Sequence, residues 1–198
     1  MFNALRIFEF AVTGIIVACF VAVVGAVVLD FAKFNLNDKA KKQKKSIVAT
    51  GTMAMFYVFF YLVIKLRAGE IMINNLPLRM AFIFLGLAII ILGTFVNVKG
   101  RIDLGKNWSN HIKIYESHTL VAKGAYKFVR HPLYASLIWI FYGACLVYFN
   151  FYAFLLNTFV FLPFMYYRAK QEERMLEQEF SEYKNYKIKT GMFFPRKL

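Results

Sequence analysis

The chain has 198 residues, of which 60% are hydrophobic and 19% aromatic, yet its formal net charge is +14. This composition excludes an ordinary soluble basic protein, because several apolar runs reach the ~20 residues needed to cross the hydrocarbon core of a bilayer. The Lys and Arg residues lie between those runs, which argues against nucleic-acid binding and favours a membrane protein attracted to anionic lipids.

Three apolar runs fill the first half of the chain, and we expect membrane spans at about 5–29, 47–64 and 78–98. The first run lacks a small-residue cleavage site, so it is interpreted as a retained span and not as a signal peptide. Six lysines between residues 33 and 45 indicate a cytoplasmic, lipid-facing loop, with a specific lipid-headgroup site as the less favoured alternative. Residues 1–98 are thus predicted to form a region of three transmembrane helices with a lysine-rich cytoplasmic loop. In the third run, Gly86 and Gly93 allow a neighbouring helix to approach closely.

The second half, residues 99–198, begins with a long polar connection at 99–130, whose length predicts a functional loop lying against the protein. Two apolar runs follow at 133–149 and 151–167, with only Asn150 between them, so we expect an antiparallel helical hairpin. Pro163 is expected to kink its second helix. The predicted fold is an all-α integral membrane protein with about five transmembrane helices.

The basic residues are distributed unevenly around these five runs. Of the 25 Lys and Arg residues, 21 lie in residues 33–45, 99–130 and 168–197. Because basic segments stay on the cytoplasmic side, an odd number of spans places the N-terminus outside and the C-terminus in the cytoplasm. Cys19 and Cys145 lie in apolar runs and are expected to be packing residues.

The most informative stretch is GAYKFVRHPLY at Gly124–Tyr134, immediately before a long apolar run. Pro132 falls at the first helical position, where its missing N–H does no harm. The N–H groups of such a helix start, together with the helix dipole, favour an anion. Arg130 adds a planar guanidinium suited to a carboxylate or a phosphate.

A charged segment follows the last apolar run, RAKQEERMLEQEFSEYKNYKIKTGMFFP at 168–195. On a continuing helix, one apolar stripe contains Ala169, Leu176, Phe180 and Tyr183, and the carboxylates of Glu172 and Glu173 flank it. Arg168 lies four residues before Glu172 and can pair with it. The alternative is a charged amphipathic helix with no catalytic or binding role, and composition alone favours this alternative.

Other chemistries find little support in the sequence. The three histidines have neither i, i+4 spacing nor cysteine partners, so no metal site is expected. His111 and His118, taken singly, are more simply explained as hydrogen-bonding residues of the polar loop. The sequence contains no βαβ pattern, which a soluble nucleotide-binding methyltransferase would need.

Taken together, the chain resembles the isoprenylcysteine carboxyl methyltransferase family, within a wider group of small integral-membrane methyltransferases that includes phospholipid N-methyltransferases. The matching pieces are GKNWS at Gly105–Ser109, HTLVAKGAYKFVRHPLYAS at His118–Ser136 and the charged segment ending in FFP at Pro195. The resemblance covers about 105–195. The combination of Arg-His-Pro-x-Tyr with a distant Glu-Glu pair is specific, and the five-span layout agrees with compact prokaryotic members.

This resemblance implies S-adenosylmethionine as cofactor, S-adenosylhomocysteine as product, and a cytoplasmic C-terminal cofactor-binding region. The implied cofactor-binding residues are His118, Leu120, Val121, Gly124, Tyr126, His131, Tyr134, Glu172 and Glu173. The implied catalytic residues are Arg130, Arg168 and Glu173. In this arrangement Arg130 and His131 suit the cofactor carboxylate, a glutamate suits its cationic parts, and Arg168 suits an acceptor carboxylate.

The expected function is methyl transfer to a lipophilic acceptor, such as the carboxylate of a prenylated cysteine, that enters from the lipid. Lipid amines and small apolar molecules stay open as acceptors. An NADPH-dependent sterol-type reductase of similar architecture and a non-enzymatic lipid-binding or assembly subunit are the alternatives. The sequence gives no indication of the oligomeric state.

Overall fold

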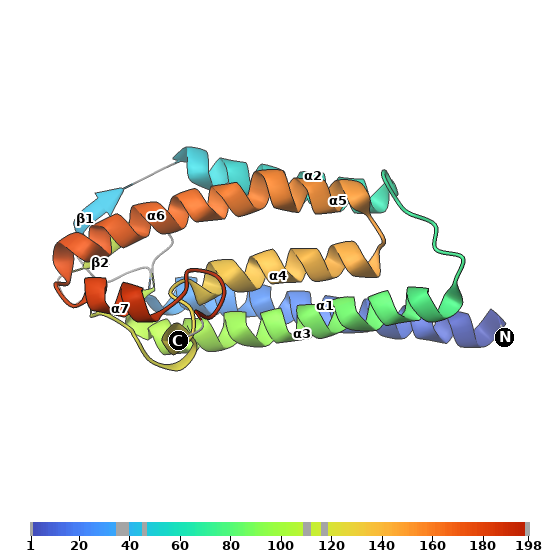
Figure 1. Ribbon diagram of the computed structural model, residues 1–198, viewed down its shortest axis with the longest axis horizontal. Helices are drawn as coiled ribbons and strands as arrows, with labels where there is room; N and C mark the ends of the chain where they lie inside the picture. Colours follow the sequence, from blue (N-terminus) through green and yellow to red (C-terminus); the bar gives the residue numbers. More distant parts are fainter. Residues whose placement is uncertain (1, 35–39, 45–46, 109–111, 116–118, 197–198) are drawn as a thin grey trace.

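The computed structural model describes residues 2–34, 40–44, 47–108, 112–115 and 119–196. Long helices form two layers, α1, α3 and α4 in one and α2, α5 and α6 in the other, with short elements gathered at one end (Figure 1). The elements are α1 (Phe2–Phe34), β1 (Ala40–Lys44), α2 (Ile47–Lys65), α3 (Leu76–Leu104), β2 (Ile112–Tyr115), α4 (Pro132–Val147), α5 (Phe151–Leu156), α6 (Leu162–Glu179) and α7 (Tyr183–Lys189).

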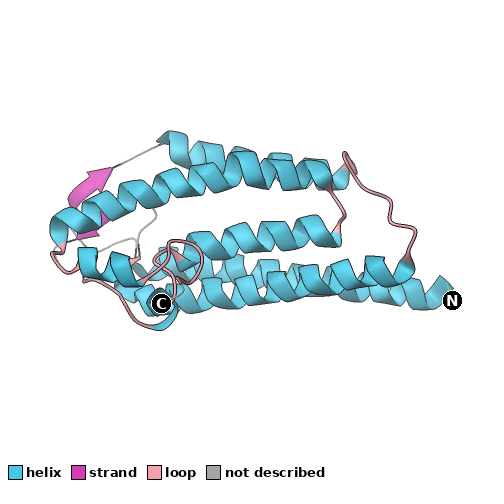
Figure 2. Cartoon of the chain, viewed as in Figure 1, coloured by secondary structure: helices cyan, strands magenta, loops and turns pink. Residues whose placement is uncertain are grey.

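The helical class is confirmed, and the structure adds one short pair of strands (Figure 2). β1 and β2 are antiparallel, with Lys42 opposite Ile114 and Lys44 opposite Ile112. The two strands come from segments about 70 residues apart in the sequence, and they lie at the same end of the bundle as α7 (Figure 1). Three of the basic segments therefore contribute to one end of the molecule.

Among the described residues, two helices are long and apolar enough to cross a bilayer, Arg6–Lys33 within α1 and Leu76–Asn107 around α3. Thr52–Lys65 in α2 and Pro132–Val147 in α4 are shorter apolar helices. Large apolar side chains on these helices face outward, as a lipid-facing surface requires; Phe10, for example, is 76% exposed. The count of five spans and their orientation stay predictions.

α3 and α4 pack with their backbones in contact at a pair of glycines. A Cβ on Gly86 would lie 2.6 Å from the carbonyl oxygen of Gly143, and a Cβ on Gly143 would lie 2.7 Å from that of Gly86. Gly93 likewise lies against Ile140. The close approach predicted for Gly86 and Gly93 is confirmed, whereas the partner of Gly86, Gly143, was not predicted.

A chain of buried polar groups joins α1, α3 and α4 near the charged end. Arg101 Nη1 lies 2.7 Å from Asp30 Oδ2, and Arg101 Nε donates to Asn97 Oδ1 at 3.0 Å. Asn97 Nδ2 in turn donates to Ser136 Oγ at 2.8 Å. Because each group in this network has a partner, its hydrogen bonds and ion pair offset the cost of burying it, and the network fixes the relative positions of three helices.

The predicted helical hairpin of α4 with the helix that follows it is present. Asn150 ends the turn and caps α5, its Oδ1 accepting a hydrogen bond from the N–H of Ala153 at 2.8 Å. α5 continues into α6 through a π-helical segment, Asn157–Phe161. A proline at 163 would crowd the carbonyl of Phe159 in a regular α-helix. The wider π-helical turn, whose hydrogen bonds run five residues along the chain, accommodates it.

Two sequence expectations about the charged end need correction. The connection 99–130 is not one loop, because α3 continues to Leu104 and 3₁₀ turns form at Gly105–Asn107 and Gly124–Lys127. The helix predicted to run through Tyr183 instead ends at Glu179, and Phe180 has extended backbone. The break lets α7 fold back so that Tyr183 is buried, and this packing outweighs continuation of the helix.

The glycine contact predicts a marked asymmetry between two Gly-to-Ala substitutions. Gly86→Ala should lower the free energy of unfolding by about 2 kcal/mol, because its methyl group forces two backbones apart. Gly25→Ala in α1 should be neutral or stabilising by up to about 1 kcal/mol, since nothing lies within 4 Å of its added Cβ. Thermal melting of both variants in detergent measures the difference, and equal melting temperatures would contradict the contact.

Candidate functional site

The Arg130–His131–Pro132 segment lies at the start of α4, as the sequence predicted. Pro132 is the first helical residue and His131 is the N-cap, without a side-chain capping hydrogen bond. The N–H groups of Arg130 and His131 donate to the carbonyls of Gly191 and Met192, at 2.8 and 3.2 Å. The C-terminal segment therefore lies directly along this helix start and fixes its two charged residues.

Arg130 and Glu173 form a buried ion pair at the centre of the site. Arg130 Nε donates to Glu173 Oε1 at 2.8 Å, and the two side chains are 8% and 1% exposed. Arg130 Nη1 donates to the carbonyls of Lys187 and Thr190. Lys187 Nζ lies 3.2 Å from Glu173 Oε2 and 2.6 Å from Glu177 Oε1. Glu173 thus ties together α6, α7 and the start of α4.

His131 lies between the two glutamates. Its Nε2 is 3.3 Å from Glu173 Oε1 and its Nδ1 is 3.6 Å from Glu172 Oε2. Burial alone would lower the pKa of His131, but hydrogen bonds and charge interactions with both carboxylates outweigh it and raise the pKa above 6.5. Burial likewise acts to raise the pKa of Glu173, and His131 and Arg130 instead lower it to about 2. Both carboxylates therefore favour their ionised form, and they in turn favour the protonated form of the imidazole between them.

The two glutamates differ in what they face. Glu173 is enclosed by its cationic partners, whereas the Glu172 side chain is 37% exposed and forms part of the wall of a large cavity. Burial acts to raise the pKa of Glu172, but His131 and Tyr134 lower it on balance. Glu172 is therefore the carboxylate that can meet a ligand, and Glu173 is the one that holds the walls of the site together.

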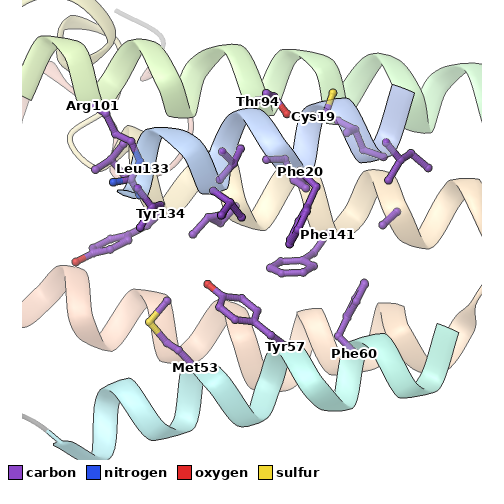
Figure 3. A pocket seen from close by; sticks show the side chains of 18 of the residues that line it. Cys19, Phe20, Met53, Tyr57, Phe60, Thr94, Arg101, Leu133, Tyr134 and Phe141 are labelled. Atoms are coloured by element: carbon purple, nitrogen blue, oxygen red, sulfur yellow. The ribbon is translucent and has the colours of Figure 1, made fainter. Parts of the chain in front are cut away.

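The cavity has a volume of about 1250 Å³, and its walls come from both helix layers. Its middle is apolar: Figure 3 shows Met53, Tyr57 and Phe60 of α2 facing Phe20 of α1 and Phe141 of α4. One end is charged and aromatic, with walls formed by residues that include Tyr126, Arg130, His131, Tyr134, Arg168, Glu172, Tyr183 and Tyr186. This volume exceeds the ~300–1000 Å³ of an ordinary small-molecule site.

Arg168 lies where the charged end meets the apolar part. Its guanidinium is 5.9 Å from the centre of the Tyr134 ring, and its Nη1 donates to the sulfur of Met53 at 3.3 Å. Its Nε is buried without a hydrogen-bond partner. A thioether is a weak acceptor for a guanidinium. An anion that enters the cavity would therefore find an under-satisfied cation at this junction.

The remaining predicted site residues fall into three groups. Leu120, Val121, Tyr126 and Tyr134 are part of the cavity wall. Gly124 is not; its φ of +60° and its contact with the carboxylate of Asp103, which also accepts from the N–H of Ala125 at 2.9 Å, give it a structural role. His118 and His111 lie outside the described residues.

Sequence reasoning missed several residues of this end. Asn107 holds the segment before Leu120, because its Oδ1 accepts from the N–H of Thr119 at 2.9 Å. Tyr186 donates its hydroxyl to the carbonyl of Tyr126 at 2.6 Å. Tyr183 was assigned only to an apolar stripe, although it is part of the cavity wall. The EYKNY sequence contains both tyrosines at a spacing of three, which is the one signal that was available. Among the described residues no group of His, Cys, Asp and Glu is placed to hold a metal ion.

Comparison with known proteins shows which families and structures this chain is similar to. A family model described as the isoprenylcysteine carboxyl methyltransferase (ICMT) family matches residues 84–178. That range begins inside α3 and ends inside α6, so it starts earlier than the 105–195 expected from the sequence and stops before α7. It includes the Arg130–His131–Pro132 segment, Arg168 and both glutamates.

The chain is also similar to curated proteins. It is 32% identical over 114 residues to a protein-S-isoprenylcysteine O-methyltransferase of Saccharomyces cerevisiae, covering 56% of this chain and 48% of that protein. It is 30% identical over 117 residues to a probable protein-S-isoprenylcysteine O-methyltransferase of Oryza sativa subsp. indica, covering 56% of this chain and 61% of that protein. The chain thus spans about half the length of the curated relatives it matches.

A solved structure of a eukaryotic intramembrane Ras methyltransferase, ICMT, superposes with a TM-score of 0.56 at 23% sequence identity. The match covers 77% of this chain and 53% of the other. At this identity the similarity shows a common fold.

The position of His131 predicts a pH-dependent stability. A raised folded pKa means that the protonated imidazole contributes fully below pH 6.5, and that this contribution is lost as the pH rises through the folded value. The melting temperature should therefore fall above pH 6.5. Glu173 stays ionised in this range and adds no slope. His131→Gln should flatten the profile, and an unchanged slope in that variant would assign the titration to another group.

The two glutamates should respond differently to neutralisation. Glu173→Gln leaves Arg130, His131 and Lys187 facing an uncharged amide and should lower the free energy of unfolding by about 3 kcal/mol. Glu172→Gln removes a partly solvated charge and should cost less than about 1 kcal/mol. Denaturation of the two isosteric variants under one set of conditions gives the comparison. Equal losses would mean that Glu173 is not the structural member of the pair.

Proposed function

Because residues 84–178 match the model of the isoprenylcysteine carboxyl methyltransferase family, we propose that this chain is a membrane-embedded, S-adenosylmethionine-dependent methyltransferase acting on the carboxylate of a prenylated cysteine. The observation that carries the proposal is the position of Arg168. An under-satisfied guanidinium at the junction of a charged site and a long apolar cavity matches a ligand with a carboxylate at the end of a hydrocarbon chain.

The charged end has the groups that S-adenosylmethionine requires. Glu172 offers an ionised carboxylate for the ammonium or the sulfonium, and His131, whose pKa is raised, offers positive charge at the start of α4 for the cofactor carboxylate. The rings of Tyr126, Tyr134 and Tyr183 can cover the adenine. When bound, the cofactor supplies a methyl group on a positively charged sulfur.

The protein contributes position and exclusion of water. Arg168 holds the acceptor carboxylate at the boundary of the charged end, and the apolar walls contributed by α1, α2 and α4 take up its hydrocarbon chain. A carboxylate is already ionised at neutral pH, so the site needs no general base. Alignment and desolvation are therefore the main sources of acceleration.

The alternatives have less support. An amine acceptor would meet the positive charge of Arg168 and would have to lose a proton first. A reductase that binds NADPH would need a cationic clamp for the 2′-phosphate. The Arg101 and Arg130 guanidiniums at this end are already paired with Asp30 and Glu173. The curated relatives reported above are named as methyltransferases.

Three single variants of α6 test the assigned roles. Arg168→Lys loses the planar fork and should lower kcat/KM for a farnesylated cysteine analogue about 100-fold, with the Kd of S-adenosylhomocysteine changed less than about threefold. Glu172→Gln should raise that Kd about tenfold. Arg174→Gln, an exposed charge on the same helix, should change neither quantity.

Calorimetry with S-adenosylhomocysteine and NADPH, together with transfer of a labelled methyl group, provides the measurements. Binding of NADPH without binding of S-adenosylhomocysteine by the unmodified protein would overturn the proposed function. Loss of both properties in Arg174→Gln would show that the assay reports on folding and not on the site.

A further inference from the structure

A second, smaller hollow lies behind the site, between α7 and the C-terminal segment. It has a volume of about 470 Å³, and its walls include Arg130, Lys184, Lys187 and Arg196, together with Ile188 and Met192. No carboxylate is among its lining residues. Arg130 alone lines both this hollow and the large cavity.

Among the described residues, two of the four cations around the hollow, Lys184 and Arg196, have no carboxylate partner. Arg196 Nη1 donates to the carbonyl of Ile188 at 2.8 Å, which positions the guanidinium without compensating its charge. Lys187 and Arg130 share Glu173, and Lys187 also pairs with Glu177. Within the described part of the chain, no ion pair involves Lys184. Four positive charges therefore face two carboxylates that lie beneath the hollow, and the excess favours an anion.

Exposed apolar side chains place the hollow at the edge of the apolar bundle. Ile188 and Phe194 are 66% and 61% exposed. The Phe194 ring lies 5.9 Å from that of Trp139, in the second turn of α4. The C-terminal segment thus follows α4 toward its apolar part. Basic and aromatic side chains together at such a boundary are typical of the headgroup level of a membrane.

We propose that this hollow binds the phosphate of an anionic phospholipid, with Lys184 and Arg196 on the phosphate and Ile188 and Phe194 against the acyl chains. The positive charge of the walls favours an anion. The neighbouring apolar side chains favour a phosphate that carries acyl chains over a soluble phosphate. This inference concerns lipid binding and does not depend on the methyl-transfer reaction.

The full-length protein in nanodiscs tests the proposal. Discs contain phosphatidylcholine and phosphatidylglycerol in equal amounts, and native mass spectrometry counts the lipids that remain bound. The unmodified protein should retain phosphatidylglycerol preferentially. Lys184→Gln with Arg196→Gln should reduce this preference about tenfold. Lys106→Gln with Lys123→Gln removes the same charge from exposed positions outside the hollow and should leave most of the preference intact.

Each outcome decides the question. Equal losses in the two double variants would reduce the effect to general attraction between a basic protein and anionic lipid, and would overturn the site. Displacement of the lipid by millimolar inorganic phosphate would identify a soluble anion as the ligand and would also overturn it. Melting temperatures of both double variants, measured in phosphatidylcholine alone, separate loss of binding from loss of fold.

Discussion

The buried carboxylate of Glu173 is the interaction on which the charged end of the molecule depends. It binds Arg130 in front of α4 and Lys187 of α7, and it lies against His131. A lone carboxylate that is 1% exposed would be strongly destabilising, and so would these cations without it. The segments that contain Glu173 and Arg130 must therefore come together for these two buried charges to be tolerated, and their meeting forms one wall of the cavity.

The two adjacent glutamates have different surroundings, a difference that the sequence alone does not reveal. A Glu-Glu dipeptide on a helix points its side chains about 100° apart, so the two can meet different surroundings. Here Glu173 is enclosed by the protein and Glu172 lines the large cavity. An acidic pair beside a cavity can thus contain one enclosed, structural member and one member that lines the cavity, and substitution of each would have a different physical consequence.

Much of the architecture was predictable, because it rests on local chemistry. Apolar run lengths predicted the helices, and Pro132 predicted the start of α4. The meeting of Arg130 and Glu173 was expected from two motifs that resemble those of one family. The Phe180 break was not predictable, since the burial of Tyr183 decides it. Neither was the Arg101–Asp30 pair, whose members are 71 residues apart. The position of Gly124 was predicted for ligand approach, but its left-handed φ serves a contact with Asp103.

The π-helical segment Asn157–Phe161 has a consequence far from where it lies. One surplus residue in a helix turns everything after it by about 100° around the axis. Asn157 locks this irregular turn to α4, its side-chain amide donating to the carbonyl of Ile138 at 3.2 Å. The π-helical segment, about 10–20 Å away along the helix axis, therefore sets the direction in which Arg168 and Glu172 point around α6. Deletion of one residue from the π-helical segment would rotate the cavity-facing side of α6 away from the cavity, although all of its side chains would still be present.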